Sequence, residues 1–346
     1  MKKILIPIML VFSLCFSVTA MDFAAPQVPE SAQRYMPNNT ESFGEGVWYV
    51  IKTAVMALHP SFAEASGICL SLIVASILIS VLQSFSGNGK RAVELAGVLI
   101  VSIILLQPAK ALLQLGITAV KNISEYGKLL LPVMTAAVAA QGGTVTSASL
   151  YAGTAFFNTV LTTMITNLIV PLLYIYLCLC VANSAVGESL LKTLRDFAKW
   201  VMTWCLKIIL YLFTGYIGIT GVISGAADAT AIKAARLAIS GVVPVVGGIL
   251  SDASETILVS AGVMKNAAGV YGLLAVIAVC IGPFLQIGMQ YLLLKMCAAV
   301  CAVLGTKKFS ELIQDFSSAM GFVLAMTGTV CLLLLISIVC FMKGVS

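Results

Sequence analysis

Few side chains in this 346-residue chain could do chemistry, and most of them lie inside long apolar segments. The single histidine, His59, excludes metal sites built from several histidines. The ten cysteines form no Cys-x-x-Cys pair and fall within apolar segments, where free thiols usually act as small hydrophobic groups. The sequence lacks a GxxxxGK[ST] phosphate loop and an HExxH metal motif. We therefore expect no enzyme activity, no cofactor and no bound metal.

Three polar residues inside one apolar segment are better candidates for function. Gln286, Gln290 and Lys295 follow Pro283, and the two glutamines are four residues apart, so on a helix they share one face. Polar side chains at membrane depth are costly, and they usually line a path or form hydrogen bonds between helices. Both alternatives stay open for the glutamines. Lys295 has a further alternative, which is to extend its ammonium group to the membrane surface.

Four prolines recur at a spacing that predicts interrupted helices. Pro132 and Pro171 are 39 residues apart, and so are Pro244 and Pro283. Proline removes a backbone donor, and broken helices at matching positions of two repeats mark the functional centre of many transporters. Ordinary kinks in packed helices are the alternative. The candidate pore or broken-helix residues are Pro132, Pro171, Pro244, Gly247, Gly248, Pro283, Gln286, Gln290 and Lys295.

The elements that must hold these residues are membrane helices. Hydrophobic residues make up 60% of the chain and charged residues 10%, whereas a soluble domain has about 25% charged residues. The apolar segments are long enough to cross a bilayer, and in lipid only helices or closed barrels satisfy their backbone groups. This composition excludes a soluble globular enzyme and predicts an all-α polytopic membrane protein. The net charge of +6 does not indicate nucleic acid, because the basic residues are scattered singly and membrane lipid surrounds them.

The N-terminal region has the pattern of a targeting segment followed by a tail. Residues 1–20 combine two lysines, a short apolar stretch and a small-residue site ending at Ala20, which predicts a cleaved signal peptide. An uncleaved short anchor is the alternative. Residues 21–65 contain five acidic and two basic residues, together with four prolines. We expect this segment to be an extracytoplasmic acidic tail, because few basic residues oppose its translocation.

The remaining chain shows signs of an internal duplication. Residues 66–115 predict two N-terminal transmembrane helices, and residues 116–225 and 226–346 predict a first and a second membrane repeat, with chance similarity as the alternative. Each repeat holds an amphipathic charged segment, residues 187–199 in the first and 305–317 in the second. A genuine duplication requires an even number of spans between these segments. The total is about six transmembrane helices if the proline-led segments dip in and return, and ten if they cross.

The basic residues indicate the cytoplasmic face only in part. The positive-inside rule assigns the pair Lys90 and Arg91, with both amphipathic segments, to the cytoplasm. The same arrangement leaves five basic residues on the other side. These are Lys121, Lys128, Lys233, Arg236 and Lys265.

Residues 192–272 resemble a known family. This stretch includes KTLRDFAKWVMTWCLKIILYLFTGYIGITGVISG and then AIKAARLAISGVVPVVGGILSDASETILVSAGVMKNAAGVYG. It is similar to stage III sporulation protein AE of endospore-forming bacteria, and the similarity extends from the signal peptide to the C-terminus. The resemblance implies a multi-pass protein of the mother-cell membrane that surrounds the forespore, the outer forespore membrane. It implies no catalytic residues.

The resemblance also implies partners and a function. The partners are the other stage III sporulation A-operon membrane proteins and, through their complex, the forespore stage II sporulation protein Q. Together they are expected to form an envelope-spanning channel complex between mother cell and forespore. We expect this chain to be its channel or permease-like component. An independent secondary transporter and a non-conducting membrane scaffold are the alternatives.

Overall fold

Helices make up every regular element in the part of the chain that the structure describes. This computed structural model describes residues 26–37, 43–242, 247–304 and 307–343. Six helical segments within these ranges are long and apolar enough to cross a membrane. The predicted all-α polytopic membrane fold is confirmed, with the number of candidate spans at the lower end of the predicted six to ten.

Two short helices precede a bundle of long ones. The short helices are α2 (Glu30–Gln33) and α3 (Phe43–Met56). The long helices follow in chain order: α4 (His59–Phe85), α5 (Lys90–Ala140), α6 (Thr144–Met164), α7 (Val170–Val186), α8 (Ser189–Val242), α9 (Gly247–Val303) and α10 (Lys307–Lys343). A 3₁₀ turn, η1 (Gly87–Gly89), connects α4 to α5, and a π-helical turn, η2 (Ile165–Ile169), joins α6 and α7 into one rod.

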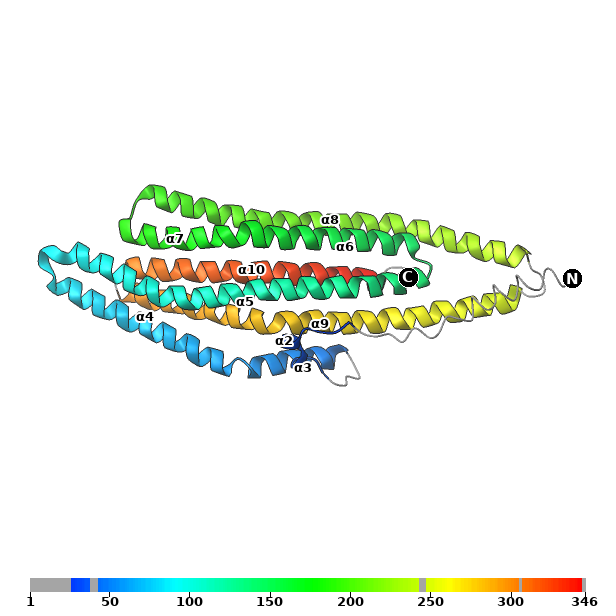
Figure 1. The fold of residues 1–346 in the computed structure, drawn as a ribbon, viewed down its shortest axis with the longest axis horizontal. Coiled ribbons are helices and arrows are strands. Elements are labelled where there is room, and N and C mark those ends of the chain that lie inside the picture. Colours follow the sequence, from blue (N-terminus) through cyan, green and yellow to red (C-terminus); the bar gives the residue numbers. More distant parts are fainter. Residues whose placement is uncertain (1–25, 38–42, 243–246, 305–306, 344–346) are drawn as a thin grey trace.

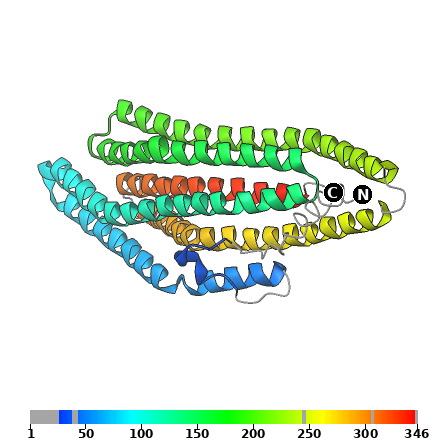
Figure 2. The same ribbon diagram turned by 45° about the vertical axis from the view of Figure 1, so that its right-hand side comes forward.

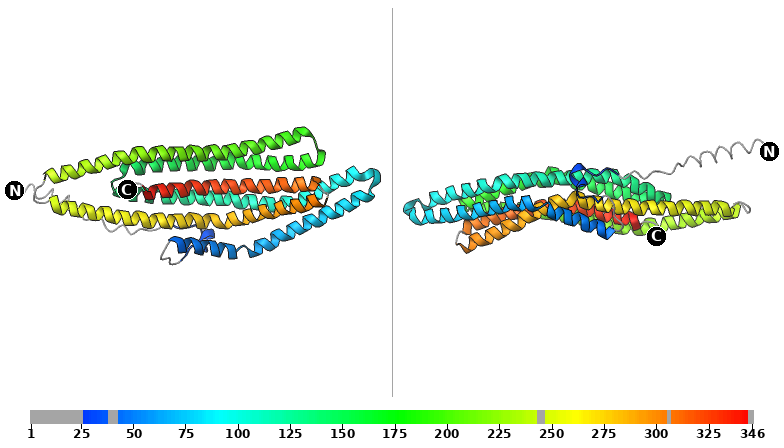
Figure 3. Two further views of the ribbon diagram at one scale, coloured as in Figure 1. Left: turned by 180° about the vertical axis from the view of Figure 1, so that it is seen from behind. Right: turned by 90° about the horizontal axis from the view of Figure 1, so that it is seen from below.

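Successive long helices, with α6–α7 counted as one rod, run in opposite directions, so the connections between them lie at the two ends of the bundle (Figures 1 and 2). We call each of these long helices a rod. The α4–α5, α7–α8 and α9–α10 connections lie toward the same end, which we call the basic end. The helices that begin there carry Lys90, Arg91, Lys192, Arg195, Lys199, Lys307 and Lys308. At the opposite end, α8 and α9 extend beyond the other rods (Figure 3).

A π-helical turn accompanies Pro171. Proline has no N–H group to donate to the carbonyl four residues earlier, and its ring presses on that carbonyl. Pro171 is the second residue after η2, whose wider turn accommodates the missing hydrogen bond. The rod continues through this point. Consequently Thr144–Val186, which contains no charged residue, forms one candidate span of 43 residues.

The longest helices exceed the thickness of a bilayer. α5 has 51 residues, or about 77 Å at 1.5 Å per residue, whereas the hydrocarbon core is about 30 Å thick. It is one helix through Pro108 and Pro132, so the predicted boundary at residue 115 falls inside it. The predicted start of the second repeat, residue 226, falls inside α8. The domain boundaries stay predictions.

Helix α10 lies at the centre of the bundle. In its most apolar window 61% of the residues are buried, against 28% for α4. Helix α5 approaches it closely at two glycines. A Cβ atom added to Gly116 would meet Val323 and Met326, and one added to Gly127 would lie 2.9 Å from Leu334. The absence of side chains at these two positions lets the helices pack together.

The two predicted amphipathic segments meet at the basic end. Arg195 of α8 donates a hydrogen bond from Nη1 to Oδ2 of Asp315 on α10 at 2.6 Å, and their side chains are only 13% and 15% exposed. The hydroxyl of Tyr176 on α7 donates to the carbonyl oxygen of Asp315 at 3.3 Å. Two rods, α8 and α9, separate the segments in the chain. Their predicted placement at one end is therefore confirmed.

Breaking the Arg195–Asp315 pair should destabilise the bundle. Removing one partner leaves the other charge nearly buried and unpaired, so Arg195→Ala should lower the free energy of unfolding by about 3 kcal/mol. The double exchange Arg195→Asp with Asp315→Arg should recover part of this loss. Lys308→Ala, which breaks the more exposed pair with Glu94, should cost about 0–1 kcal/mol. Thermal unfolding in detergent measures all three, and equal midpoints for both alanine variants would contradict the prediction.

Adding a methyl group to Gly116 should also destabilise the protein. In Gly116→Ala the new methyl overlaps Val323, and overpacking of this kind costs about 1–3 kcal/mol. Gly218 on α8 is the matched control, because a Cβ atom there has no heavy atom within 4 Å. Gly218→Ala should keep or raise the unfolding midpoint, since alanine favours helix. A tolerated Gly116→Ala would show that α5 and α10 are not closely packed.

Candidate functional site

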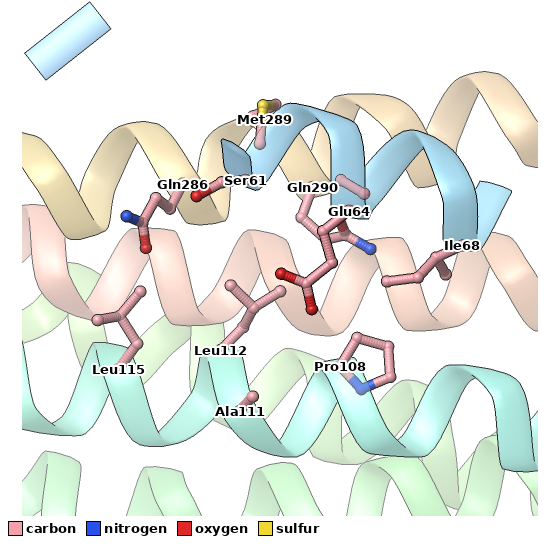
Figure 4. Close-up of a pocket in the computed structure, with 11 residues that line it drawn as sticks. Ser61, Glu64, Ile68, Pro108, Ala111, Leu112, Leu115, Gln286, Met289 and Gln290 are labelled. Atoms are coloured by element: carbon pink, nitrogen blue, oxygen red, sulfur yellow. The ribbon is translucent and has the colours of Figure 1, made fainter. Parts of the chain in front are cut away.

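A polar cavity lies between α4, α5 and α9. Its volume is about 280 Å³ (Figure 4). Its polar wall consists of Ser61 and Glu64 from α4 and of Gln286 and Gln290 from α9. Gln286 lies near the centre of the candidate span Asn266–Val303, and the cavity opens to the surface of the bundle beside Glu64, which is exposed. We call it the central cavity.

Two glutamines of α9 face the central cavity together, as their spacing of four residues predicts. Gln286 is half-buried, and Gln290 is only 3% exposed. The Nε2 atom of Gln290 is buried and has no hydrogen-bond partner among the described residues. An unpaired buried donor costs about 1–3 kcal/mol. Gln290 lines the cavity, but its amide nitrogen is covered in this structure, so a polar solute or water in the cavity reaches it only when the side chain turns.

The opposite wall brings a carboxylate to the same cavity. Pro60 stands in the first turn of α4, where its missing N–H group costs no helical hydrogen bond. Ser61 and Glu64 follow, and their spacing of three residues turns both toward α9. Figure 4 shows the Glu64 side chain reaching from α4 into the space beside Leu112 of α5. A carboxylate and two amides thus share one small volume.

A second cavity of about 160 Å³ adjoins the first. Leu115 and Gln286 line both cavities, and Arg34 and Thr118 line the second. Tyr35 anchors this region, because its ring is buried and its hydroxyl oxygen lies 3.0 Å from a Cβ atom added to Gly282 of α9. The guanidinium carbon of Arg34 stands 5.8 Å from the centre of the Tyr35 ring. The tail before the bundle therefore contributes a basic side chain to the site.

Prolines line the two cavities from two of the wall-forming helices, α5 and α9. Pro283 of α9 lines the second cavity, and Pro108 of α5 lines the central one. Pro283 leaves the carbonyl of Val279 without its helical donor, and Val279 lines the same cavity. Irregular helical hydrogen bonding at membrane depth is tolerated where it is buried in protein or lines a cavity. These two prolines occur at such a place.

The structure brings three of the nine sequence-predicted residues together, namely Pro283, Gln286 and Gln290. Lys295 is exposed on α9, where its Nζ atom stands 5.6 Å from the centre of the Tyr291 ring, and it does not line either cavity. Four others do not line either cavity, and the last is outside the described residues. Pro132 is in α5, Pro171 is in α7, Gly247 and Gly248 begin α9, and Pro244 lies outside the described residues.

Sequence reasoning missed several residues of the site, among them Glu64, Pro108, Arg34 and Asn122. Glu64 had been counted only as part of the acidic tail, although it lies in the first two turns of a candidate span. Pro108 is flanked by Gln107 and Lys110, and this polar stretch in an apolar helix was a usable signal. Arg34 had no such signal, because α2 and the bundle are brought together only by the fold.

The polar groups around the two cavities suit binding of a polar solute better than catalysis. Within the described ranges, no three His, Cys, Asp or Glu side chains are grouped so that they could hold a metal ion. The nine cysteines there are free thiols. A carboxylate, two amides and a guanidinium group can bind ammonium, hydroxyl or carboxylate groups by hydrogen bonding. What this arrangement can do is hold or pass a small polar molecule.

Comparison with known proteins assigns the chain to a family. The family model described as stage III sporulation protein AE (spore_III_AE) matches residues 34–344, which is most of the chain. The chain belongs to the stage III sporulation protein AE family. It is 21% identical over 305 residues to the stage III sporulation protein AE of Bacillus subtilis (strain 168), covering 87% of this chain and 76% of that protein. No solved structure matches the chain.

Membership of the stage III sporulation protein AE family confirms the resemblance seen in residues 192–272. It also makes the chain a sporulation protein, and the six apolar helices indicate a membrane location. The matched range begins at Arg34, so both cavities lie within the part shared with the family.

Replacing Gln290 by leucine tests whether its buried amide contributes to stability. Leucine has a similar volume and removes an unpaired buried amide, so Gln290→Leu should keep or raise the midpoint of thermal unfolding. Gln314→Leu, at an exposed position of α10, is the control and should leave that midpoint unchanged. A clear loss of stability in Gln290→Leu alone would show that the amide is already hydrogen bonded within the fold.

Proposed function

We propose that this chain is an integral membrane subunit of a sporulation-specific, envelope-spanning channel complex between mother cell and forespore. It acts as the channel or permease-like component of that complex and not as an enzyme. Its place is the mother-cell membrane around the forespore, the outer forespore membrane. Its partners are the other stage III sporulation A-operon membrane proteins and, through them, the forespore stage II sporulation protein Q.

The observation that carries this proposal is the central cavity. A protein that only holds others together gains stability from continuous apolar packing, and a polar cavity in its bundle lowers that stability. Here Gln290 is buried with an unpaired donor, and Glu64 and Gln286 face the same space. Polar groups at membrane depth usually mark a path or a binding site. Family membership adds that the path serves sporulation.

The orientation follows from the basic end. The rods that begin there carry seven of the basic residues, and the positive-inside rule assigns that end to the mother-cell cytoplasm. Six spans return the chain to the face from which α4 started. The predicted tail, residues 21–65, therefore begins on the extracytoplasmic side in this proposal, and its last residues, from His59, form the start of α4. The predicted signal peptide, residues 1–20, lies outside the described residues.

Neutralising the central cavity should stop sporulation without removing the protein. In cells that lack the native gene, the double variant Glu64→Gln with Gln290→Leu should lower the yield of heat-resistant spores at least about tenfold, because the cavity loses its charge and its free amide. Protein level and co-purification with the other stage III A proteins should be unchanged. Glu311→Gln with Gln314→Leu changes an exposed face of α10 and should sporulate normally.

The same cells distinguish the alternatives. A scaffold would give normal spore yields with the cavity variant, because its partners are still recruited, and this result would contradict the proposal. An independent secondary transporter would show substrate-coupled flux when it is purified alone into lipid vesicles. The proposal expects flux only from vesicles that contain the assembled complex.

A further inference from the structure

The two adjoining cavities carry opposite charges. Leu115 of α5 and Gln286 of α9 line both, so the two cavities share part of their walls, and we call them together the elongated site. Among the described residues, Glu64 is the one charged residue that lines the central cavity and Arg34 is the one that lines the second cavity. None of the three ion pairs in the described part of the chain includes either residue. A carboxylate and a guanidinium group therefore remain for a ligand.

The length of the elongated site follows from the helices that pass both cavities. Helix α5 lines the central cavity over 108–115 and the second cavity over 115–122. The midpoints of these stretches are about seven residues apart, which is about 10 Å at 1.5 Å per residue. Figure 4 shows Glu64 beside Leu112, near the first midpoint. A ligand that meets both charged residues must therefore carry its own charges about 10 Å apart.

An amide lies between the two charged residues. Gln286 is half-buried and faces both cavities, and its side chain has both a hydrogen-bond donor and an acceptor. A peptide group has the same two functions, so Gln286 can accept from a peptide N–H and donate to a peptide C=O. Much of the remaining wall is apolar, as at Ala111, Leu112, Ala119 and Val279. This wall suits small apolar side chains.

A free α-amino acid is too short to reach both charged residues. Its nitrogen and its carboxyl carbon are two bonds apart, or about 2.5 Å. An extended chain spans at most about 3.3–3.6 Å per residue, so three residues reach about 10 Å. The two cavities have volumes of about 280 and 160 Å³, which together lie within the range of about 300–1,000 Å³ that is usual for small-molecule sites.

We propose that the elongated site binds a short zwitterionic peptide of about three small residues, with its ammonium group at Glu64 and its carboxylate at Arg34. The reverse orientation places like charges together. Because both charged residues are exposed, the ends of the peptide reach them from outside the bundle. The inference rests on the proposed function for the role of the site, and on the geometry of the two cavities for the class of ligand.

Capped peptides test the two ends of the elongated site. The probe is tri-alanine, titrated into the full chain in mild detergent and followed by isothermal titration calorimetry. Acetylation of its amino end or amidation of its carboxyl end removes one charge, and each should weaken binding about tenfold. Free alanine should also bind about tenfold more weakly, because it reaches only one end. Equal binding of tri-alanine and both capped forms, or no binding of tri-alanine, would overturn the proposal.

Replacing one charged residue at a time tests the orientation. With Glu64→Gln, acetylation of tri-alanine should have no further effect, whereas amidation should still weaken binding about tenfold. With Arg34→Gln the two results should be reversed. Glu125→Gln on α5 and Lys52→Gln on α3 are the controls, because each removes an exposed charge that lines neither cavity, and both should bind the peptides as the native chain does. Effects of both caps that persist in both cavity variants would place the peptide elsewhere and contradict the proposal.

Peptide binding and spore yield can fail separately. If tri-alanine does not bind, but Glu64→Gln with Gln290→Leu still lowers the spore yield, then the inferred ligand is wrong and the proposed function stands. If tri-alanine binds with the expected pattern and those cells sporulate normally, then the peptide site stands and the proposed function is wrong.

Discussion

The bilayer interior offers no hydrogen bonds to a backbone and almost no solvation to a charge, and this constraint shapes the whole molecule. It requires helices wherever the chain crosses, and many charged side chains gather at the basic end, Lys90, Arg195 and Lys307 among them. Where a charge is withdrawn from solvent there, it is paired, as Arg195 is with Asp315 at 2.6 Å. The same constraint makes polar groups within the bundle informative. The unpaired amide of Gln290 and the exposed charges of Lys121 and Glu125 on α5 are costly in lipid alone.

Helices α5 to α9 of the bundle pack around α10. Hydrophobic burial does not drive membrane helices together in lipid, so close fit between them must do so. Helix α5 approaches α10 at Gly116 and Gly127, where no side chain intervenes. The same arrangement occurs twice, in α6–α7 with α8 and in α9 with α10. In each case a long helical segment has a proline in its second half and turns at the basic end. The helix that follows has charged residues near its start. This likeness is in keeping with the predicted duplication, whose boundaries stay predictions.

The central cavity forms where this close packing is interrupted. Helices α5 and α9 each carry a proline at its wall, and α4 crosses them with Ser61 and Glu64. A tail residue, Tyr35, closes the adjoining cavity against Gly282. The site is thus assembled from four separate parts of the chain. Its carboxylate, amide and guanidinium groups can bind a polar solute, and Thr118 of α5 also lines the adjoining cavity.

The sequence alone determined the class of fold, the depth of Gln286 and Gln290 and their common face, because hydropathy and a period of 3.6 residues are local properties. The placement of residues 187–199 at the same end as 305–317 also followed from the sequence, since the predicted repeat required an even number of spans between them. Only the structure shows that the two segments are in contact, through Arg195 and Asp315. Only the tertiary structure decided that Pro283 belongs to the site whereas Pro132 and Pro171 do not. It alone also joined Arg34, Glu64 and Pro108 to the glutamines. The reason is that residues of different helices become neighbours only when the helices align along their length in one particular way. Contacts such as Gly116 with Val323 set that alignment, and no periodicity within one segment records them.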